Sequence, residues 1–256
     1  MSTEARSRSR ELREARTAAG RRRRKRIHLV AIGGGLIIAG LVVAIVIALV
    51  NAAGGKPSPA AKSGPAPAIA TADGALALGR ADAPVRLEVY LDYMCPFCGR
   101  FETANGAEVA QLVEAGTVRL ELHPLAFLDQ ASSGTRYSTR AANAVATVAD
   151  RAPEKVLAFS AALFAYQPAE GGEGLTDERI AELARGAGVP TDVVTAFGQR
   201  TFEAWAASAT QAAFSSGVSG TPTVRIDGKA FQGDLYTAGP LTQALTAAAA
   251  GAKGAR

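Results

Sequence analysis

The sequence predicts a mixed α/β domain that follows a single membrane-spanning helix. An uncharged apolar run covers residues 29–50, a strand–helix–strand pattern begins at Val85, and an alanine-rich helical stretch covers 135–216. Strands show alternating apolar residues and helices show apolar residues at a period near 3.6. The chain has 256 residues, of which 48% are hydrophobic and 20% charged. This length supports one good core and excludes several large domains.

The net charge of +5 is concentrated at the N-terminus. Residues 1–26 carry a charge of +8, so the remaining chain carries −3. A nucleic-acid-binding domain would need its basic residues clustered on the folded surface, so no nucleic-acid partner is expected. Two cysteines exclude a scaffold with several disulfides, and with two histidines they supply too few ligands for a zinc site. We therefore expect no metal and no cofactor.

The apolar run predicts a transmembrane helix over 27–50. At about 1.5 Å per residue, such a helix spans a hydrocarbon core of about 30 Å. The basic sequence at 21–26 abuts it, which predicts a disordered cytoplasmic tail over 1–26 and a single-pass protein of the cell membrane. The rest of the chain is then extracytoplasmic. A cleaved signal peptide stays open as an alternative, because small residues follow at 51–53.

The sequence after the apolar run divides into a linker and one folded body. Residues 51–75 are rich in Ala, Gly, Pro and Ser and predict a linker without a core. The first part of the domain, 76–134, contains an expected strand at 85–91, a helix at 99–115 and a strand at 117–122. The helical insertion covers 135–216. The second part, 217–250, contains a strand at 221–226 and a final helix from Pro240, and 251–256 form a frayed tail.

Both cysteines lie in the tetrapeptide Cys95-Pro96-Phe97-Cys98, between a strand and a helix. The free N–H groups and partial positive charge of a helix N-terminus stabilise a thiolate on Cys95. Pro96 is suited to the first helical turn, where no N–H is needed. A structural disulfide would close too short a loop to stabilise the fold, and zinc lacks ligands. A redox-active pair is the favoured interpretation.

Three segments resemble the DsbA-like branch of the thioredoxin superfamily: 78–85, the Asp92-Tyr93-Met94-Cys95-Pro96-Phe97-Cys98 motif, and Gly217-Val218-Ser219-Gly220-Thr221-Pro222-Thr223. The resemblance covers about 76–250 and implies a thioredoxin fold split by the helical insertion. It implies that Cys95 attacks, that Cys98 resolves, and that Pro96 and Phe97 belong to the active-site motif. It also implies a cis-Pro222, which turns the backbone of Thr221 toward the cysteines.

Two positions depart from the pattern of relatives. Many relatives carry an acidic residue six positions before the first cysteine, where this chain has Val89. Glu88 is expected on the opposite strand face, so it is not expected to act as a base. The best-known oxidase of this branch has a His between its cysteines, and Phe97 cannot make that hydrogen bond.

The predicted function is thiol–disulfide exchange on cysteine-containing exported proteins, with oxidation as the favoured direction. The resemblance implies a quinone-linked membrane partner of the DsbB or VKOR kind. A reductase or isomerase of the same fold, and a non-catalytic peptide-binding module, remain as alternatives. Around the motif, Asp92 is expected to be a cap or solvated turn residue, and His123 a satisfied strand-end residue. If unfolded chains are the substrates, some exposed apolar surface is expected around Met94, Phe97 and Thr221.

Four aromatic residues of the helical stretch are expected in its core rather than in a peptide groove. They are Phe159, Phe202, Trp205 and Phe214.

Overall fold

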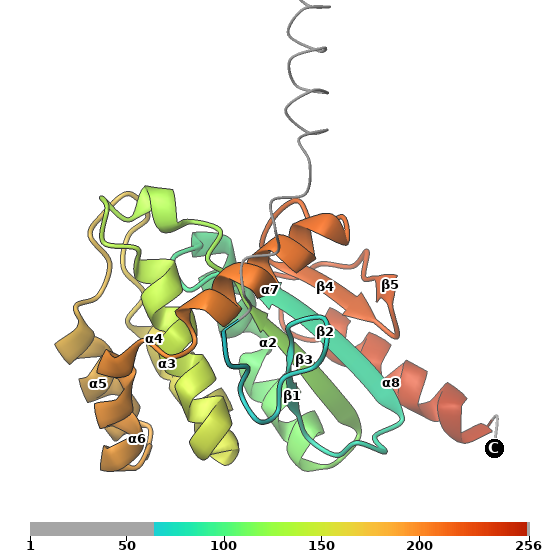
Figure 1. Ribbon diagram of the computed structural model, residues 1–256. Helices are drawn as coiled ribbons and strands as arrows, with labels where there is room; N and C mark the ends of the chain where they lie inside the picture. The colour runs from blue at the N-terminus through green and yellow to red at the C-terminus, as the bar shows by residue number, and fades with distance from the viewer. Residues whose placement is uncertain (1–63, 255–256) are drawn as a thin grey trace, which may run out of the picture. The chain divides into compact units, whose positions relative to one another are not determined.

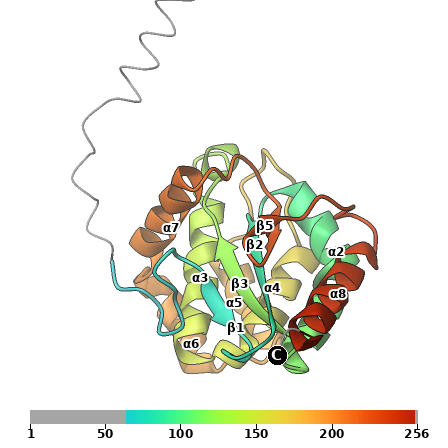
Figure 2. The same ribbon diagram turned by 90° about the vertical axis from the view of Figure 1, so that its right-hand side faces the viewer.

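A computed structural model describes residues 64–254, which form a five-stranded sheet with helices on both faces (Figures 1 and 2). The strands are β1 (Leu76–Leu78), β2 (Val85–Leu91), β3 (Val118–Pro124), β4 (Thr223–Ile226) and β5 (Lys229–Ala230). The helices are α2 (Pro96–Glu114), α3 (Tyr137–Arg151), α4 (Val156–Ala165), α5 (Asp177–Gly186), α6 (Thr191–Thr195), α7 (Glu203–Ser215) and α8 (Pro240–Gly254). Short 3-10 turns lie at Asp129–Ala131, Pro153–Lys155 and Ala196–Gln199.

The sheet has the order β1-β3-β2-β4-β5, with β2 and β3 parallel and the other neighbours antiparallel. The expected strand–helix–strand crossover is therefore present, with α2 joining the two parallel strands. Strand β2 is central, because it pairs with β3 on one side and β4 on the other; Leu87, for example, lies opposite Leu120 and Ile226. Its apolar residues are buried. The C-terminal end of this buried strand leads directly into the two cysteines.

The two faces of β2 have different partners. Val89 and Leu91 face the side of α2, where they line a hollow together with Phe101. Tyr90 belongs to a separate apolar cluster with residues at the end of α7. Helices α2 and α8 lie on one side of the sheet and α7 on the other (Figure 2). This alternation places α2, and with it the cysteines, against the apolar face that contains Val89.

The helical insertion forms the layer at the left of Figure 1, built from α3 to α6 with the start of α7. Most of α3 is buried, because its alanines allow the neighbouring helices to approach closely. Of the four aromatic residues expected in this core, Phe159, Phe202 and Trp205 are buried. Phe214 is 39% exposed and packs against Phe127, with ring centroids 5.5 Å apart. The interpretation of Phe214 as a core residue is therefore wrong.

The strands expected at 117–122 and 221–226 run over Val118–Pro124 and Thr223–Ile226 instead, and two expected domain boundaries also differ. Residues 64–75, assigned to the linker from their composition, contact the domain: Ala68 N–H donates to Asp150 at 2.9 Å, and Ala70 forms a bridge with Leu76. The last helix continues to Gly254, so residues 251–254 are helical. The predicted transmembrane helix over 27–50 lies outside the described residues. Within residues 64–254, no helix combines the length and the apolar character needed to cross a bilayer.

The packing of residues 64–75 predicts an effect of Gly74→Ala on stability. Gly74 has a φ of +87°, and an added Cβ would lie 2.7 Å from the Ala209 Cβ. We expect strain and overlap together to lower the free energy of unfolding by more than about 2 kcal/mol. Gly134→Ala is the matched control, because Gly134 has a φ of +84° with open space around it. It should cost only about 1–2 kcal/mol. Equal losses in urea unfolding would contradict the packing of this segment.

Candidate active site

The cysteine motif lies at the N-terminus of α2, immediately after the β2 strand and a short loop. Cys95 is the N-cap residue, and Pro96 is the first helical residue. The helix therefore begins three residues earlier than the expected start at Gly99. The Cys98 and Gly99 N–H groups both donate to the Cys95 carbonyl, at 2.9 and 3.2 Å. The free N–H groups of this first turn favour negative charge at Cys95.

The two thiols are free and have opposite electrostatic environments. The pKa of Cys95 is lowered to about 6, mainly by a hydrogen bond from the Cys98 thiol. Burial acts in the opposite direction and raises this pKa, whereas the N–H groups of Cys98 and Phe97 also lower it. Burial is the main cause that raises the pKa of Cys98 far above its ordinary value. Cys95 is 5% exposed and Cys98 is fully buried. The site thus holds one stabilised, reachable thiolate and one shielded thiol.

The loop before β4 meets Cys95 from the other side. Cys95 Sγ lies 3.3 Å from the Thr221 carbonyl, to which it donates when protonated. The Thr221–Pro222 peptide bond is cis, as the resemblance implies. These residues are more than 120 positions apart in the chain, and strand β4 brings them together by pairing with β2. The structure therefore places Cys95, Cys98, Thr221 and Pro222 around one point.

Asp92 is a fully buried carboxylate beside this pair. Its oxygens accept hydrogen bonds from Met94 N–H at 2.8 Å, Leu128 N–H at 2.8 Å and Ser138 Oγ at 2.7 Å. Burial raises the pKa of Asp92 to about 6, although these three donors favour the ionised form. Its own N–H donates to Cys98 Sγ at 3.5 Å. The expectation of a solvated turn residue is therefore wrong, while the capping contact to Met94 is present.

Gln167 is a site residue that the sequence analysis missed. It follows α4 in the helical insertion, and its amide donates to the carbonyls of Tyr93 and Cys95, at 3.0 and 2.9 Å. A Cβ at position 99 would overlap the Gln167 amide, so Gly99 makes this approach possible. No local pattern marks a glutamine that acts 70 residues from the motif. The insertion thus fixes the conformation of the cysteine loop.

Apolar surface surrounds the motif, although Met94 is fully buried and does not contribute as expected. Phe97 is 52% exposed, and its ring centroid lies 6.0 Å from that of Tyr236. The guanidinium of Arg100 lies 4.5 Å above the Tyr236 ring. Five large apolar residues of the described region are exposed: Phe97, Phe127, Tyr166, Phe214 and Tyr236.

Glu88 and His123 lie on the sheet face away from the cysteines. Glu88 forms ion pairs with Arg86 at 3.0 Å and Arg225 at 3.7 Å, which agrees with its expected position. The His123 ring stacks on Tyr90 with centroids 3.9 Å apart, and neither of its nitrogens has a hydrogen-bond partner among the described residues. Burial lowers the pKa of His123 to about 4, so it is neutral at pH 7. Its description as a satisfied residue is therefore wrong.

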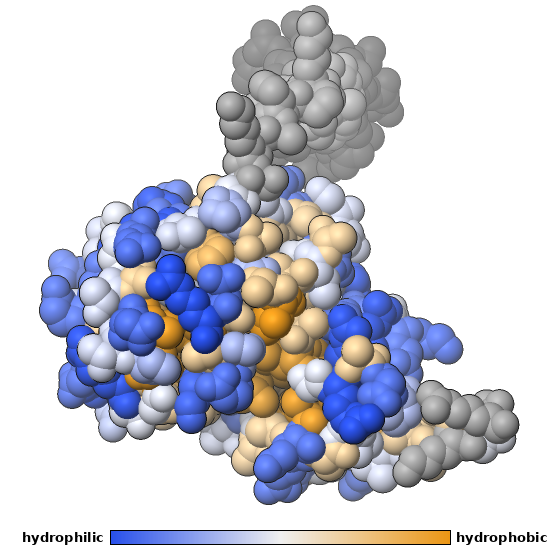
Figure 3. Space-filling model, turned by 60° about the horizontal axis from the view of Figure 1, so that its bottom comes forward, coloured by the Kyte–Doolittle hydropathy of each residue, from blue (hydrophilic) through white to orange (hydrophobic). Residues whose placement is uncertain are grey.

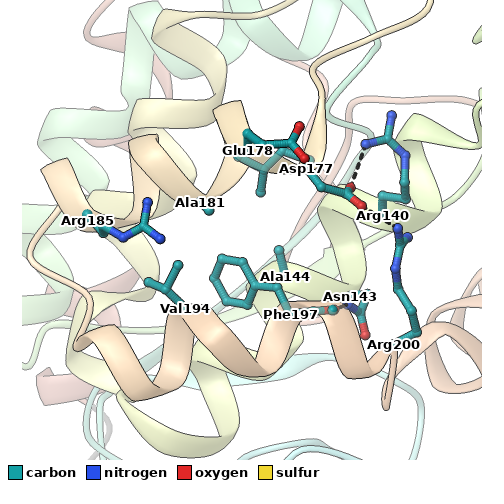
Figure 4. Close-up of a pocket in the computed structure, with 12 residues that line it drawn as sticks. Arg140, Asn143, Ala144, Asp177, Glu178, Ala181, Arg185, Val194, Phe197 and Arg200 are labelled. Carbon is teal, nitrogen blue, oxygen red and sulfur yellow. Dashed lines mark hydrogen bonds and ion pairs between the residues drawn. The ribbon is translucent and has the colours of Figure 1, made fainter.

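A separate hollow of about 290 Å³ lies within the helical insertion (Figure 4). Asp177 lies between Arg140 and Arg200, at 2.8 and 2.5 Å, and Arg200 also pairs with Glu203 at 2.9 Å. These charges already have partners within the fold. In residues 64–254, no cluster of three or more His, Cys, Asp or Glu side chains could hold a metal ion.

Comparison with known proteins assigns the family. A family model described as thioredoxin matches residues 71–243, which covers the strands, the cysteine motif and the insertion. This chain belongs to the thioredoxin family. Among curated proteins, it is similar to the serine/threonine-protein kinase PknE of Mycobacterium tuberculosis, with 32% identity over 157 residues. That match covers 57% of this chain and only 27% of the kinase.

Solved structures place the chain among its DsbA-like members. It is 30% identical to a disulfide bond oxidoreductase (DsbG) of M. tuberculosis, with a TM-score of 0.57, covering 72% of this chain and 97% of that one. It is also 30% identical to M. tuberculosis DsbA, with a TM-score of 0.56 and coverage of 70% and 99%. The chain is 27% identical to the MdbA thiol-disulfide oxidoreductase of Actinomyces oris, with a TM-score of 0.62. This match covers 75% of this chain and 93% of MdbA. These similarities support disulfide chemistry at Cys95 and Cys98.

The hydrogen bond between the thiols predicts different effects of two substitutions at Cys98. Cys98→Ala removes the donor, so the pKa of Cys95 should rise from about 6 toward its ordinary value. Cys98→Ser keeps an O–H donor and should leave that pKa near its starting value. Thiolate absorbance at 240 nm, followed from pH 4 to 10, measures both. Identical titrations of the two variants would contradict the assigned cause.

The buried charge of Asp92 predicts that Asp92→Asn has two separable effects. The amide cannot accept from all three donors, so unfolding free energy should fall by about 1–3 kcal/mol. Because Asp92 and Cys95 repel each other as anions, the pKa of Cys95 should also fall. Ser138→Ala is the control, since it removes one hydrogen bond and keeps the charge. An unchanged Cys95 pKa in Asp92→Asn would leave Asp92 with a purely structural role.

Proposed function

We propose that this chain is a membrane-tethered, extracytoplasmic thiol-disulfide oxidase that introduces disulfides into exported proteins. The observation that carries the proposal is the asymmetry of the cysteine pair. Cys95 has a stabilised thiolate at a helix N-terminus, whereas the Cys98 thiol is buried and protonated at neutral pH. A low pKa makes Cys95 a good leaving group, which favours transfer of the disulfide to a substrate.

The oxidised enzyme would react through a mixed disulfide. A substrate thiolate attacks Cys95 Sγ, the Cys95–Cys98 bond breaks, and Cys98 leaves with the electron pair and takes up a proton. A second substrate thiolate then attacks the substrate sulfur of the mixed disulfide and releases Cys95 as a thiolate. The substrate loses two electrons and gains one disulfide, and the enzyme is left as a dithiol. Approach is possible only at Cys95, because Cys98 is fully buried.

The exposed aromatic residues support a polypeptide as substrate. Phe97 and Tyr236 lie beside the motif, and Phe127 and Phe214 pack together near the end of α7. Exposed apolar surface of this kind binds the apolar segments that unfolded chains expose. The Thr221 carbonyl, 3.3 Å from Cys95 Sγ, is placed to accept a hydrogen bond from the backbone of a bound chain.

Turnover requires that the dithiol be reoxidised. A quinone-linked membrane protein of the DsbB or VKOR kind would accept these two electrons. The uncharged residues 29–50 and the basic residues before them support a tether with a cytoplasmic N-terminus, which would keep the site close to such a partner. With this proposed tether the domain would lie outside the cytoplasm, where exported proteins acquire disulfides.

The direction of exchange predicts the reduction potential of the pair. Full-length protein equilibrated in glutathione buffers should show a potential near about −120 mV, because the stabilised thiolate favours the reduced form. A value near about −270 mV would instead mark a reductant and overturn the oxidase assignment.

Two variants test the order of attack in the same preparation. Cys95→Ser should abolish oxidation of a reduced two-cysteine peptide. Cys98→Ala, mixed with a disulfide-linked dimer of a one-cysteine peptide, should release one peptide as a thiol and retain the other as a mixed disulfide at Cys95, because no second thiol is present to release it. Activity that survives Cys95→Ser would indicate a binding module rather than an enzyme.

A further inference from the structure

A long apolar groove lies between α2 and α4 and reaches down to the sheet. Its volume is about 1010 Å³, which is within the range of sites that hold sizeable ligands. The walls include side chains of β2, β3, α2 and α4: Val89, Phe101, Val109, Leu120, Leu122 and Leu157. Apolar residues also gather in the middle of the face drawn in Figure 3, between polar margins. A groove of this size next to a reactive cysteine requires an explanation.

Within the described region, the unpaired charged residues that line this groove are all acidic. Three carboxylates line it, those of Glu102, Glu114 and Glu154, and none has a hydrogen bond or ion pair with another residue of the 64–254 region. The one basic lining residue, Arg80, is already paired with Asp82 at 2.8 Å. Glu102 lies among apolar residues, and burial raises its pKa to about 7. An apolar occupant that carries a positive charge would complement this surface.

The groove is continuous with the surface of the cysteine motif. A second hollow of about 440 Å³ begins at Pro96 and Gly99, and it shares the lining residues Thr103 and Phe164 with the groove. A chain held at Cys95 therefore has a path along α2 into the groove. A small amphiphilic cation would fill only the groove and would not need the second hollow. A polypeptide that reacts at Cys95 would occupy both hollows, which favours a polypeptide as the occupant.

We propose that the α2–α4 groove binds an apolar segment of the polypeptide that reacts at Cys95, with a Lys or Arg side chain of that segment paired with Glu102. This assignment rests on the proposed function. It adds to that function a preference for substrate cysteines that lie near a basic residue in an apolar sequence.

The geometry of α2 predicts how many residues separate the reacting cysteine of the substrate from its basic residue. Glu102 follows Cys95 by seven residues, or about 10 Å along α2 at 1.5 Å per residue. An extended peptide rises about 3.3 Å per residue and covers this distance in about three residues. Because a lysine side chain can reach in either direction along the groove, the basic residue should lie about three to five positions from the reacting cysteine.

The experiment compares three peptides with one cysteine in an apolar sequence. One has Lys four residues from the cysteine, the second has norleucine there, and the third has Glu. Oxidised full-length protein reacts with each, and the rate of mixed-disulfide formation is measured from pH 6 to 8. The thiol pKa of each peptide is measured separately and the rates are expressed per thiolate, because a nearby lysine lowers the pKa of the peptide thiol. At pH 8 we expect roughly tenfold preference for Lys. The preference should weaken as pH falls through about 7, where Glu102 takes up a proton.

Glu102→Gln should remove the preference for Lys, while the rate with glutathione stays unchanged because the cysteine motif is untouched. Glu170→Gln is the control, since Glu170 is exposed and outside the groove. Ala158→Trp, at an exposed position in the groove wall, should lower the rates for all three peptides and spare glutathione.

Three results would overturn the proposal. Equal rates for the three peptides in the unaltered protein would leave the enzyme active and the groove without a role. Reaction with none of them, and none with glutathione, would instead refute the proposed function. A change of oligomeric state in Ala158→Trp, with unaltered peptide rates, would show that the groove holds a second copy of this chain.

Discussion

The buried carboxylate of Asp92 is the interaction on which the geometry of the cysteine pair depends. It joins three segments that are distant in the chain: its own loop, the segment after β3 through Leu128, and α3 through Ser138. A buried charge is stable only when donors replace the lost water, and here the three segments supply them. The same residue contacts Cys98 through its own N–H. Folding of the insertion and placement of the thiols are thereby coupled through one side chain.

The difference between the two thiols arises from the geometry of one helical turn. Cys95 lies at the N-cap, where backbone N–H groups and the Cys98 thiol stabilise negative charge. Cys98 lies inside the first turn, facing the apolar side of the sheet, where burial disfavours its thiolate. The position that relatives occupy with an acid is Val89, and it lines the apolar groove on this side. Val89 thus places no carboxylate at this position on the cysteine side of β2, and Cys98 instead has polar contacts with the N–H of Asp92, with Cys95 and with Thr221.

The sequence predicts those parts of the fold that depend on local pattern. The alternation in Val85–Leu91 predicts β2 with its correct bounds, and the motif is correctly placed between a strand and a helix, although α2 begins at Pro96 and not at Gly99. Apart from the capping contact of Asp92 to Met94, the partners of Asp92 and Gln167 lie between 36 and 74 residues away, and no local signal marks them. Residues 64–75 were misassigned because small residues pack by close backbone approach, as Gly74 does on Ala209, and not by large side chains.

The insertion contributes to the site in two ways that are physically distinct. Gln167 fixes the carbonyls of Tyr93 and Cys95 by hydrogen bonds, which sets the shape of the reacting loop. Helix α4, which precedes it, provides the far wall of the groove along α2. Substitutions on the exposed side of α4 can therefore alter what the groove accepts without touching the donors that lower the pKa of Cys95. Chemistry resides in the first turn of α2, whereas selectivity resides in how α4 is spaced from it.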